Sequence, residues 1–131
     1  MNDNELIERL KQKSDGLLWQ SESDYPFEVI YWSNVDNINA RLLQLTDCTL
    51  ETTIEVRELD KFFSQATAES DWYNDEEMAE CKRYRELVNL LKTHLTDIKV
   101  YRVGETEINY YILGKTESGS IAGLSTISIE T

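Results

Sequence analysis

Apolar residues recur at intervals of three and four in two stretches of the chain, the spacing that places side chains on one face of a helix. The first stretch, around Leu6 and Leu10, predicts a short helix over 4–13 with Asn2 or Asp3 as its cap. The second predicts the longest helix, over 75–95, with one face buried. Its apolar stripe consists of Met78, Cys81, Tyr84 or Arg85, Val88, Leu91 and Leu95.

Runs rich in β-branched and aromatic residues predict the strands. One such run covers 27–32, and 52–56 alternates polar and apolar residues as a half-buried strand does. The C-terminal third contains three further runs, at 100–103, 106–113 and 120–129. Glycines in the two connections between these runs favour turns. We therefore expect the chain to end in a three-stranded meander.

Three stretches are less regular. Segment 21–26 is polar and ends in Pro26, which predicts a loop. Segment 60–66 predicts a short helix that carries two adjacent phenylalanines. In segment 37–46 the apolar residues have helical spacing, but the run 42–45 could also extend a sheet; we expect a helix there.

The order of these elements predicts an α+β protein, with helices early, a long helix in the middle and antiparallel strands at the end. The sheet should be mostly antiparallel, with flanking helices on both of its faces. The 131 residues contain no internal repeat and no long linker, so we expect a single domain over 1–131. A hydrophobic content of 40% and a single proline exclude wholesale disorder and collagen-like structure.

The net charge of the chain limits the classes of molecule that we expect it to bind. Thirteen Lys and Arg face 25 Asp and Glu, which gives a net charge of −12. Such a chain repels phosphate backbones, so we expect no direct binding of nucleic acid. A basic partner protein suits this charge, because opposite potentials speed association.

The cellular compartment is predicted from the absence of targeting signals and membrane spans in the sequence. The N-terminus is acidic and polar, without the basic and apolar regions of a signal peptide, and no run approaches the ~20 apolar residues of a membrane span. We expect a cytoplasmic protein that does not bind membranes. In that compartment Cys48 and Cys81, 33 positions apart, should be reduced and packed thiols, with a disulfide the lesser alternative.

The inventory of catalytic residues is poor. His94 is the only histidine, and no phosphate-binding loop, dinucleotide fingerprint or nucleophile elbow is present. The many carboxylates leave open a two-carboxylate hydrolase or a magnesium site. Their densest run is more simply explained as a helix start with a solvated face; it comprises Asp71, Asp75, Glu76, Glu77 and Glu80. A binding protein is favoured over an enzyme, and we expect no cofactor.

Four blocks of residues, in order along nearly the whole chain, resemble the sugar-non-specific nuclease inhibitor family, the inhibitors of nuclease A. No single block is a chemical motif, but four in register make a chance match improbable. The blocks are SDGLL (14–18), SES (21–23) and YPFE (25–28); FFS (62–64), AT (66–67) and DWY (71–73); VYR (100–102) and GE (104–105); and AG (122–123) and ST (125–126), with ET at 130–131. Residues 33–58 resemble the family least.

The resemblance implies an α/β/α sandwich and a protein that blocks a non-specific DNA and RNA endonuclease by capping its active site. Such nucleases use a histidine base and one Mg²⁺ ion. The family's interface is centred on a loop glutamate, a tryptophan and a C-terminal threonine that reaches the metal. These positions match Glu22, Trp72 and Thr131, so Thr131 would contact the Mg²⁺ of the partner nuclease in the complex. The free protein should be a monomer.

Each of these residues also has an ordinary structural interpretation. Glu22 could decorate a turn, Trp72 could belong to the core, and Thr131 could be a frayed end. An alternative function is an acidic interaction module of the same fold with a different basic partner. If the inhibitor interpretation holds, Glu22 and Trp72 should be exposed on one side of the free protein.

Overall fold

The computed structural model describes residues 2–19, 24–33, 38, 41–42, 54–67, 72–104 and 107–129. The helices in this part are α1 (Asp3–Ser14), α3 (Leu59–Phe62), α4 (Ser64–Thr67) and α5 (Asp75–His94). The strands are β1 (Leu18–Trp19), β2 (Tyr25–Pro26), β3 (Glu28–Trp32), β4 (Ile54–Arg57), β5 (Thr96–Val103), β6 (Glu107–Lys115) and β7 (Ile121–Ile129). No helix in the described part is long and apolar enough to cross a membrane.

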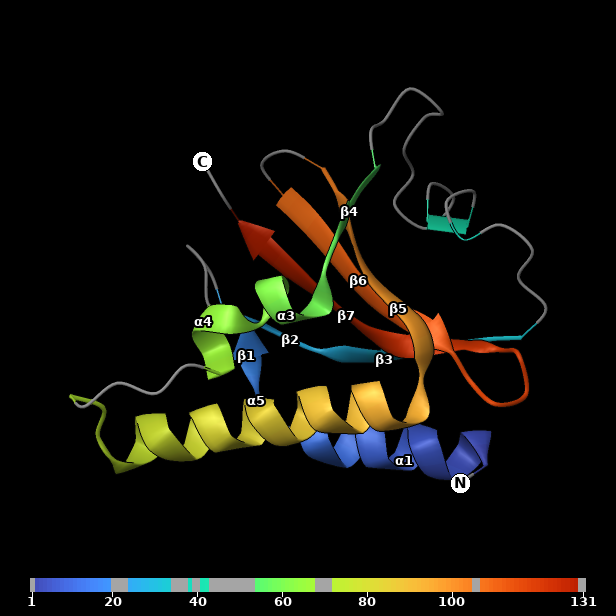
Figure 1. The fold of residues 1–131 in the computed structure, drawn as a ribbon. Helices are drawn as coiled ribbons and strands as arrows, with labels where there is room; N and C mark the ends of the chain where they lie inside the picture. The colour runs from blue at the N-terminus through green and yellow to red at the C-terminus, as the bar shows by residue number, and fades with distance from the viewer. Residues whose placement is uncertain are drawn as a thin grey trace.

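Five strands form one antiparallel sheet in the order β3-β7-β6-β5-β4 (Figure 1). The consecutive strands β5, β6 and β7 lie side by side, which confirms the predicted C-terminal meander. The two short strands β1 and β2 pair with each other as a separate hairpin. The predicted α+β class with an antiparallel sheet is therefore confirmed.

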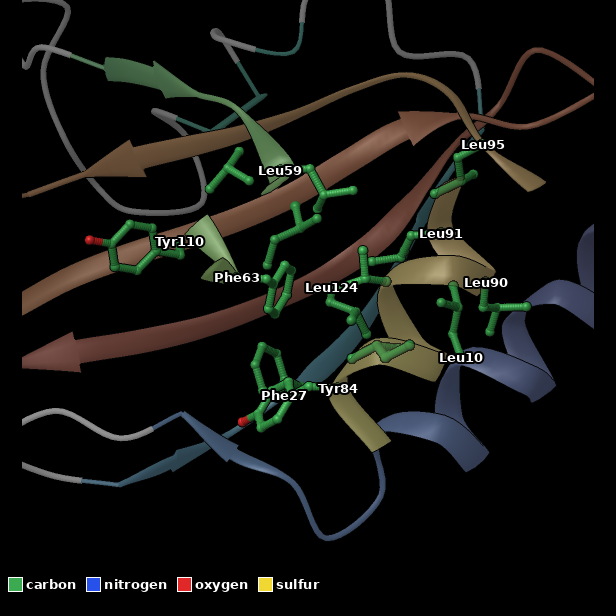
Figure 2. Packing of buried hydrophobic residues seen from close by; sticks show 14 of the residues in the cluster. Leu10, Phe27, Leu59, Phe63, Tyr84, Leu90, Leu91, Leu95, Tyr110 and Leu124 are labelled. Carbon is green, nitrogen blue, oxygen red and sulfur yellow. The ribbon is translucent and has the colours of Figure 1, made fainter. Parts of the chain in front are cut away.

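The two faces of the sheet bury separate sets of side chains, because successive residues of a strand point to opposite faces. One face of the sheet packs against α1, α3 and α5 and forms the larger hydrophobic core with them (Figure 2). Its strand residues include Val100, Tyr110, Ile112 and Leu124. The other face carries a second cluster, in which the helical residue Leu42 is completely buried; its strand residues are Tyr101, Val103, Tyr111, Leu113 and Ile121. Helical residues thus cover both faces, as expected.

Polar side chains cap the starts of the two longest helices of the described chain, α1 and α5. The Asn2 side chain accepts a hydrogen bond of 2.8 Å from the Glu5 amide, which fixes the start of α1. Helix α5 begins with a capping box between Asn74 and Glu77, in which each side chain bonds the other's backbone amide. The predicted ranges 4–13 and 75–95 are correct to within one residue at each end. Cys81, on α5, is buried, while Cys48 lies outside the described residues.

Three predicted elements differ in detail. The expected loop over 21–26 ends in strand β2, which pairs with β1 because extended backbone at Tyr25, ahead of a proline, suits a short strand. Segment 60–66 is not one helix: α3 and α4 are separated at Phe63, whose ring is buried. Strand β5 begins four residues before position 100, with a bulge between Thr96 and Lys99.

The bulge explains why the sequence pattern does not reveal the start of β5. Asp97 there has a positive φ of 53°, which breaks the two-residue alternation that identifies a strand. Of the expected helix over 37–46, only positions 38, 41 and 42 are described, and these are helical. The predicted strand over 52–56 corresponds to β4, with residues 52–53 outside the described part.

Candidate functional site

Trp72 presents most of its ring to solvent. Its exposed fraction is 82%, against 55% for Val56, the next most exposed large hydrophobic residue of the described chain. Its ring and the Tyr73 ring are arranged edge to face, with centroids 6.4 Å apart and planes at 89°. This exposure rules out the core interpretation of Trp72. The expectation that Trp72 is a surface residue is confirmed.

The capping box positions this tryptophan just outside the first turn of α5. The Glu77 amide donates to Asn74 Oδ1 at 2.8 Å, and the Asn74 amide donates to Glu77 Oε1 at 3.5 Å. The chain therefore enters α5 in a fixed direction two residues after Trp72. Asp75 and Glu76 follow, both exposed, in the turn where the helix dipole favours negative charge. The result is an exposed aromatic ring next to an acidic helix start.

The other carboxylates of the described chain are exposed or half-buried. None of the described Asp or Glu side chains is buried, and no group of three or more His, Cys, Asp or Glu among them could hold a metal ion. His94, the last residue of α5, is half-buried. The described members of the acidic run, Asp75 to Glu80, behave as a solvated helix start, and Asp71 lies outside the described residues.

Glu22 lies outside the described residues, but both strands that flank it are described. Trp19 pairs with Tyr25 across the β1–β2 hairpin, so Glu22 falls in the connection between them. The Trp19 ring stacks on Phe62 of α3, with centroids 4.4 Å apart and planes at 13°. Because aromatic stacking and burial both favour this contact, the base of the hairpin is held against the helical layer.

Thr131 also lies outside the described residues, two positions after the end of β7. The Thr126 hydroxyl of β7 donates to the carbonyl oxygens of Pro26 at 3.1 Å and of Tyr25 at 3.5 Å. The hairpin that carries Glu22 is therefore joined to the strand that leads to Thr131. In Figure 1 the hairpin, α4, the beginning of α5 and the end of β7 all lie toward the left of the view.

Local sequence patterns indicate some features of this region and not others. The capping box has a sequence signal, an Asn followed three residues later by a Glu, at Asn74 and Glu77. The β1–β2 hairpin has a much weaker signal, since its strands are two residues long. The contacts of Tyr84 with Leu18 and of Arg85 with Thr67 join residues far apart in the chain, so no local pattern could indicate them.

Comparison with known proteins identifies the family of the chain. None of the curated proteins compared with the chain matches it. A family model described as nuclease A inhibitor-like protein (NuiA) matches residues 4–131. The match covers the hairpin, the acidic start of α5 with Trp72, and the C-terminal meander. The chain therefore belongs to the nuclease A inhibitor-like family.

Proposed function

We propose that this protein inhibits a sugar-non-specific DNA and RNA endonuclease by capping the active site that contains its Mg²⁺ ion. The observation that carries the proposal is the family match over 4–131 together with the 82% exposure of Trp72 beside an acidic helix start. The protein has no catalytic role in this proposal. It acts by occupying the nuclease cleft in place of nucleic acid.

The charge and the tryptophan have different tasks in such a complex. A nuclease cleft attracts phosphate backbones, and a chain with a net charge of −12 is drawn to the same potential, which raises the association rate. Trp72 supplies apolar area at the centre of the contact, where large aromatic side chains contribute most of the binding energy. Rate and affinity therefore depend on different residues.

Glu22 and Thr131 complete the proposed contact. Glu22 would pair with a basic group in the cleft. Thr131 offers a hydroxyl oxygen and, in a chain that ends at this residue, a carboxylate; both are the hard oxygen donors that Mg²⁺ prefers. Support for bringing the two together comes from the hydrogen bonds between Thr126 and the hairpin strand β2.

The direct test follows plasmid degradation by a Mg²⁺-dependent, sugar-non-specific endonuclease in the presence of the pure protein. We expect stoichiometric inhibition by the wild type. Trp72→Ala should raise the inhibition constant at least about 30-fold, the effect of losing a central aromatic contact. The fold should be retained, because most of the ring already lies in water.

Val56→Ala is the matched control, since it also truncates an exposed apolar side chain, on β4. It should change inhibition less than about twofold, as surface substitutions outside an interface do. A wild type that leaves plasmid degradation unchanged over a panel of such nucleases would overturn the proposal. It would favour an acidic interaction module with another basic partner.

A further inference from the structure

Three consecutive residues of α5 each donate a hydrogen bond to the backbone of a different segment. Arg83 Nη2 donates to the backbone carbonyl of Lys13 at 3.4 Å and also to that of Asp15. Tyr84 Oη donates to the carbonyl of Leu18 at 2.7 Å. Arg85 Nε donates to the carbonyl of Thr67 at 2.9 Å. Successive helix residues point about 100° apart, so the three side chains reach about 200° around α5. We call Arg83, Tyr84 and Arg85 the α5 clamp. It holds the end of α1, the hairpin strand β1 and the end of α4.

The Arg85 contact limits where Trp72 can lie. Arg85 follows the N-cap Asn74 by eleven residues, which is about 16 Å along the axis of α5. The connection from Thr67 to Asn74 has seven residue steps and can span at most about 24 Å. The Arg85 hydrogen bond to the Thr67 carbonyl and the capping box at Asn74 therefore fix both ends of this connection. Trp72 lies within it.

The Tyr84 contact acts in the same way on the hairpin. The Tyr84 ring is buried beside Phe27, and its hydroxyl is directed toward β1, where it bonds the Leu18 carbonyl (Figure 2). Burial, the larger cause, and the nearby Glu80 carboxylate raise the pKa of Tyr84, so its hydroxyl stays a donor. On the other strand, the Thr126 hydroxyl holds Pro26. Both ends of the connection that carries Glu22 are therefore fixed.

We propose that Arg85 and Tyr84 are positioning residues of the inhibitory surface, Arg85 for Trp72 and Tyr84 for Glu22. Each acts through the backbone carbonyl that it holds and makes no contact with the nuclease. The consequence for inhibition rests on the proposed function. The holding of the two connections is a property of the free protein, so it can be tested without a nuclease.

The first test measures amide hydrogen exchange in the free protein by mass spectrometry. Arg85→Ala should speed exchange at least about fivefold in peptides covering 68–74 and leave peptides covering 18–25 unchanged. Tyr84→Phe, which keeps the buried ring, should give the reverse pattern. The controls are Lys82→Ala, with the same charge change on α5, and Tyr101→Phe, with the same hydroxyl loss from a buried ring on the other face of the sheet.

The two controls should leave both groups of peptides unchanged. The reciprocal pattern supports the clamp, because a general loss of stability would speed exchange across the core strands as well. Equal effects of the two variants on both connections, or no effect on either, would overturn it.

The second test measures coupling in nuclease inhibition. Arg85→Ala should raise the inhibition constant on the order of tenfold, and it should add nothing further once Trp72 is alanine. Tyr84→Phe should show the same relation to Glu22→Ala. The crossed pairs, Arg85→Ala with Glu22→Ala and Tyr84→Phe with Trp72→Ala, should be additive. Additivity in the matched pairs would overturn the positioning role.

The two tests separate the two proposals. If the wild type inhibits no nuclease, the proposed function fails, and the exchange pattern alone decides whether the clamp exists. If the wild type inhibits but the exchange pattern is uniform, the clamp fails and the proposed function stands. Arg85→Lys keeps a cationic donor at the site, so it should recover part of the inhibition that Arg85→Ala loses. If the Arg85 side chain contributed only packing, no charge would be required at this position.

Discussion

A tryptophan with 82% of its surface exposed leaves a large apolar ring in water, and Trp72 does so two residues before the capping box of α5. The sequence alone could not decide between core and surface for this residue, because an aromatic residue before a helix serves either purpose. The direction of the chain at the cap is determined by local hydrogen bonds, whereas exposure depends on what else packs nearby. Only the assembled structure supplies that information.

Gly123 is the residue where the sheet tolerates a side chain least. A Cβ atom placed there would lie 1.7 Å from the Ile112 carbonyl oxygen and 2.8 Å from its carbon, on the neighbouring strand β6. Both are backbone atoms, so neither can move without breaking the pairing between β6 and β7. We expect Gly123→Ala to lower the free energy of unfolding by about 2–4 kcal/mol, measured by urea denaturation.

Gly119→Ala is the comparison for this prediction. Gly119 has a positive φ of 85°, but no atom lies within 4 Å of the place that a Cβ atom would take, so alanine there costs only the conformational strain. That strain is about 1 kcal/mol. Equal losses for the two variants would show that strand β7 can move away from β6 at Gly123.

At the scale of elements, the sequence predicts what depends on local periodicity. The buried stripe of α5 and the β-branched and aromatic runs of β6 and β7 place these elements almost correctly. Local periodicity cannot predict the β1–β2 hairpin, because strands of two residues are too short to show it. These strands are defined by their pairing, here Trp19 with Tyr25. Glu22, Trp72 and Thr131 come from a family resemblance, since no chemical pattern in the sequence singles them out.

The start of α1 depends on hydroxyl groups that link it to strand β3 and to the β6–β7 turn. The Asp3 carboxylate accepts hydrogen bonds from Ser118 at 2.6 Å, in the β6–β7 turn, and from Tyr31 at 2.7 Å, on β3. The Ser118 bond first and the Tyr31 bond second lower the pKa of Asp3 below its ordinary value of 3.8. The contact therefore stabilises the ionised, folded state.

The sign of the pH dependence follows from that direction. A folded pKa below the unfolded value contributes stability above pH 3.8, and this contribution is lost as the pH falls through the lowered folded pKa. Asp3→Asn should therefore be less stable than the wild type at pH 7, and the difference should shrink below pH 3.8. Thermal melts at about pH 7, 5 and 3 check this. A difference between the two proteins that stays constant over this range would contradict the ionic origin of the contact.

At the scale of the whole molecule, a net charge of −12 and a short list of contact residues would contribute to inhibition in different ways. Long-range attraction acts on association and is screened within about 8 Å at physiological ionic strength. The contacts proposed for Trp72 and Thr131 would act at short range and govern dissociation. Salt should therefore slow association while leaving the dissociation rate nearly unchanged, if the contacts carry the affinity.

The proposed metal contact of Thr131 gives the sharpest test of this division. Mg²⁺ requires near-octahedral geometry at about 2.1 Å, so an oxygen displaced by one residue is a poor ligand. Deleting Thr131 from a chain that ends there should weaken inhibition at least about tenfold, and a C-terminal tag should act similarly. The melting temperature should stay nearly unchanged, because the β7 pairing ends at Ile129. If the shortened and tagged proteins inhibit as well as the wild type, Thr131 does not contact the metal. Charge would then carry the inhibition, which should fade as salt rises through about 0.15 M.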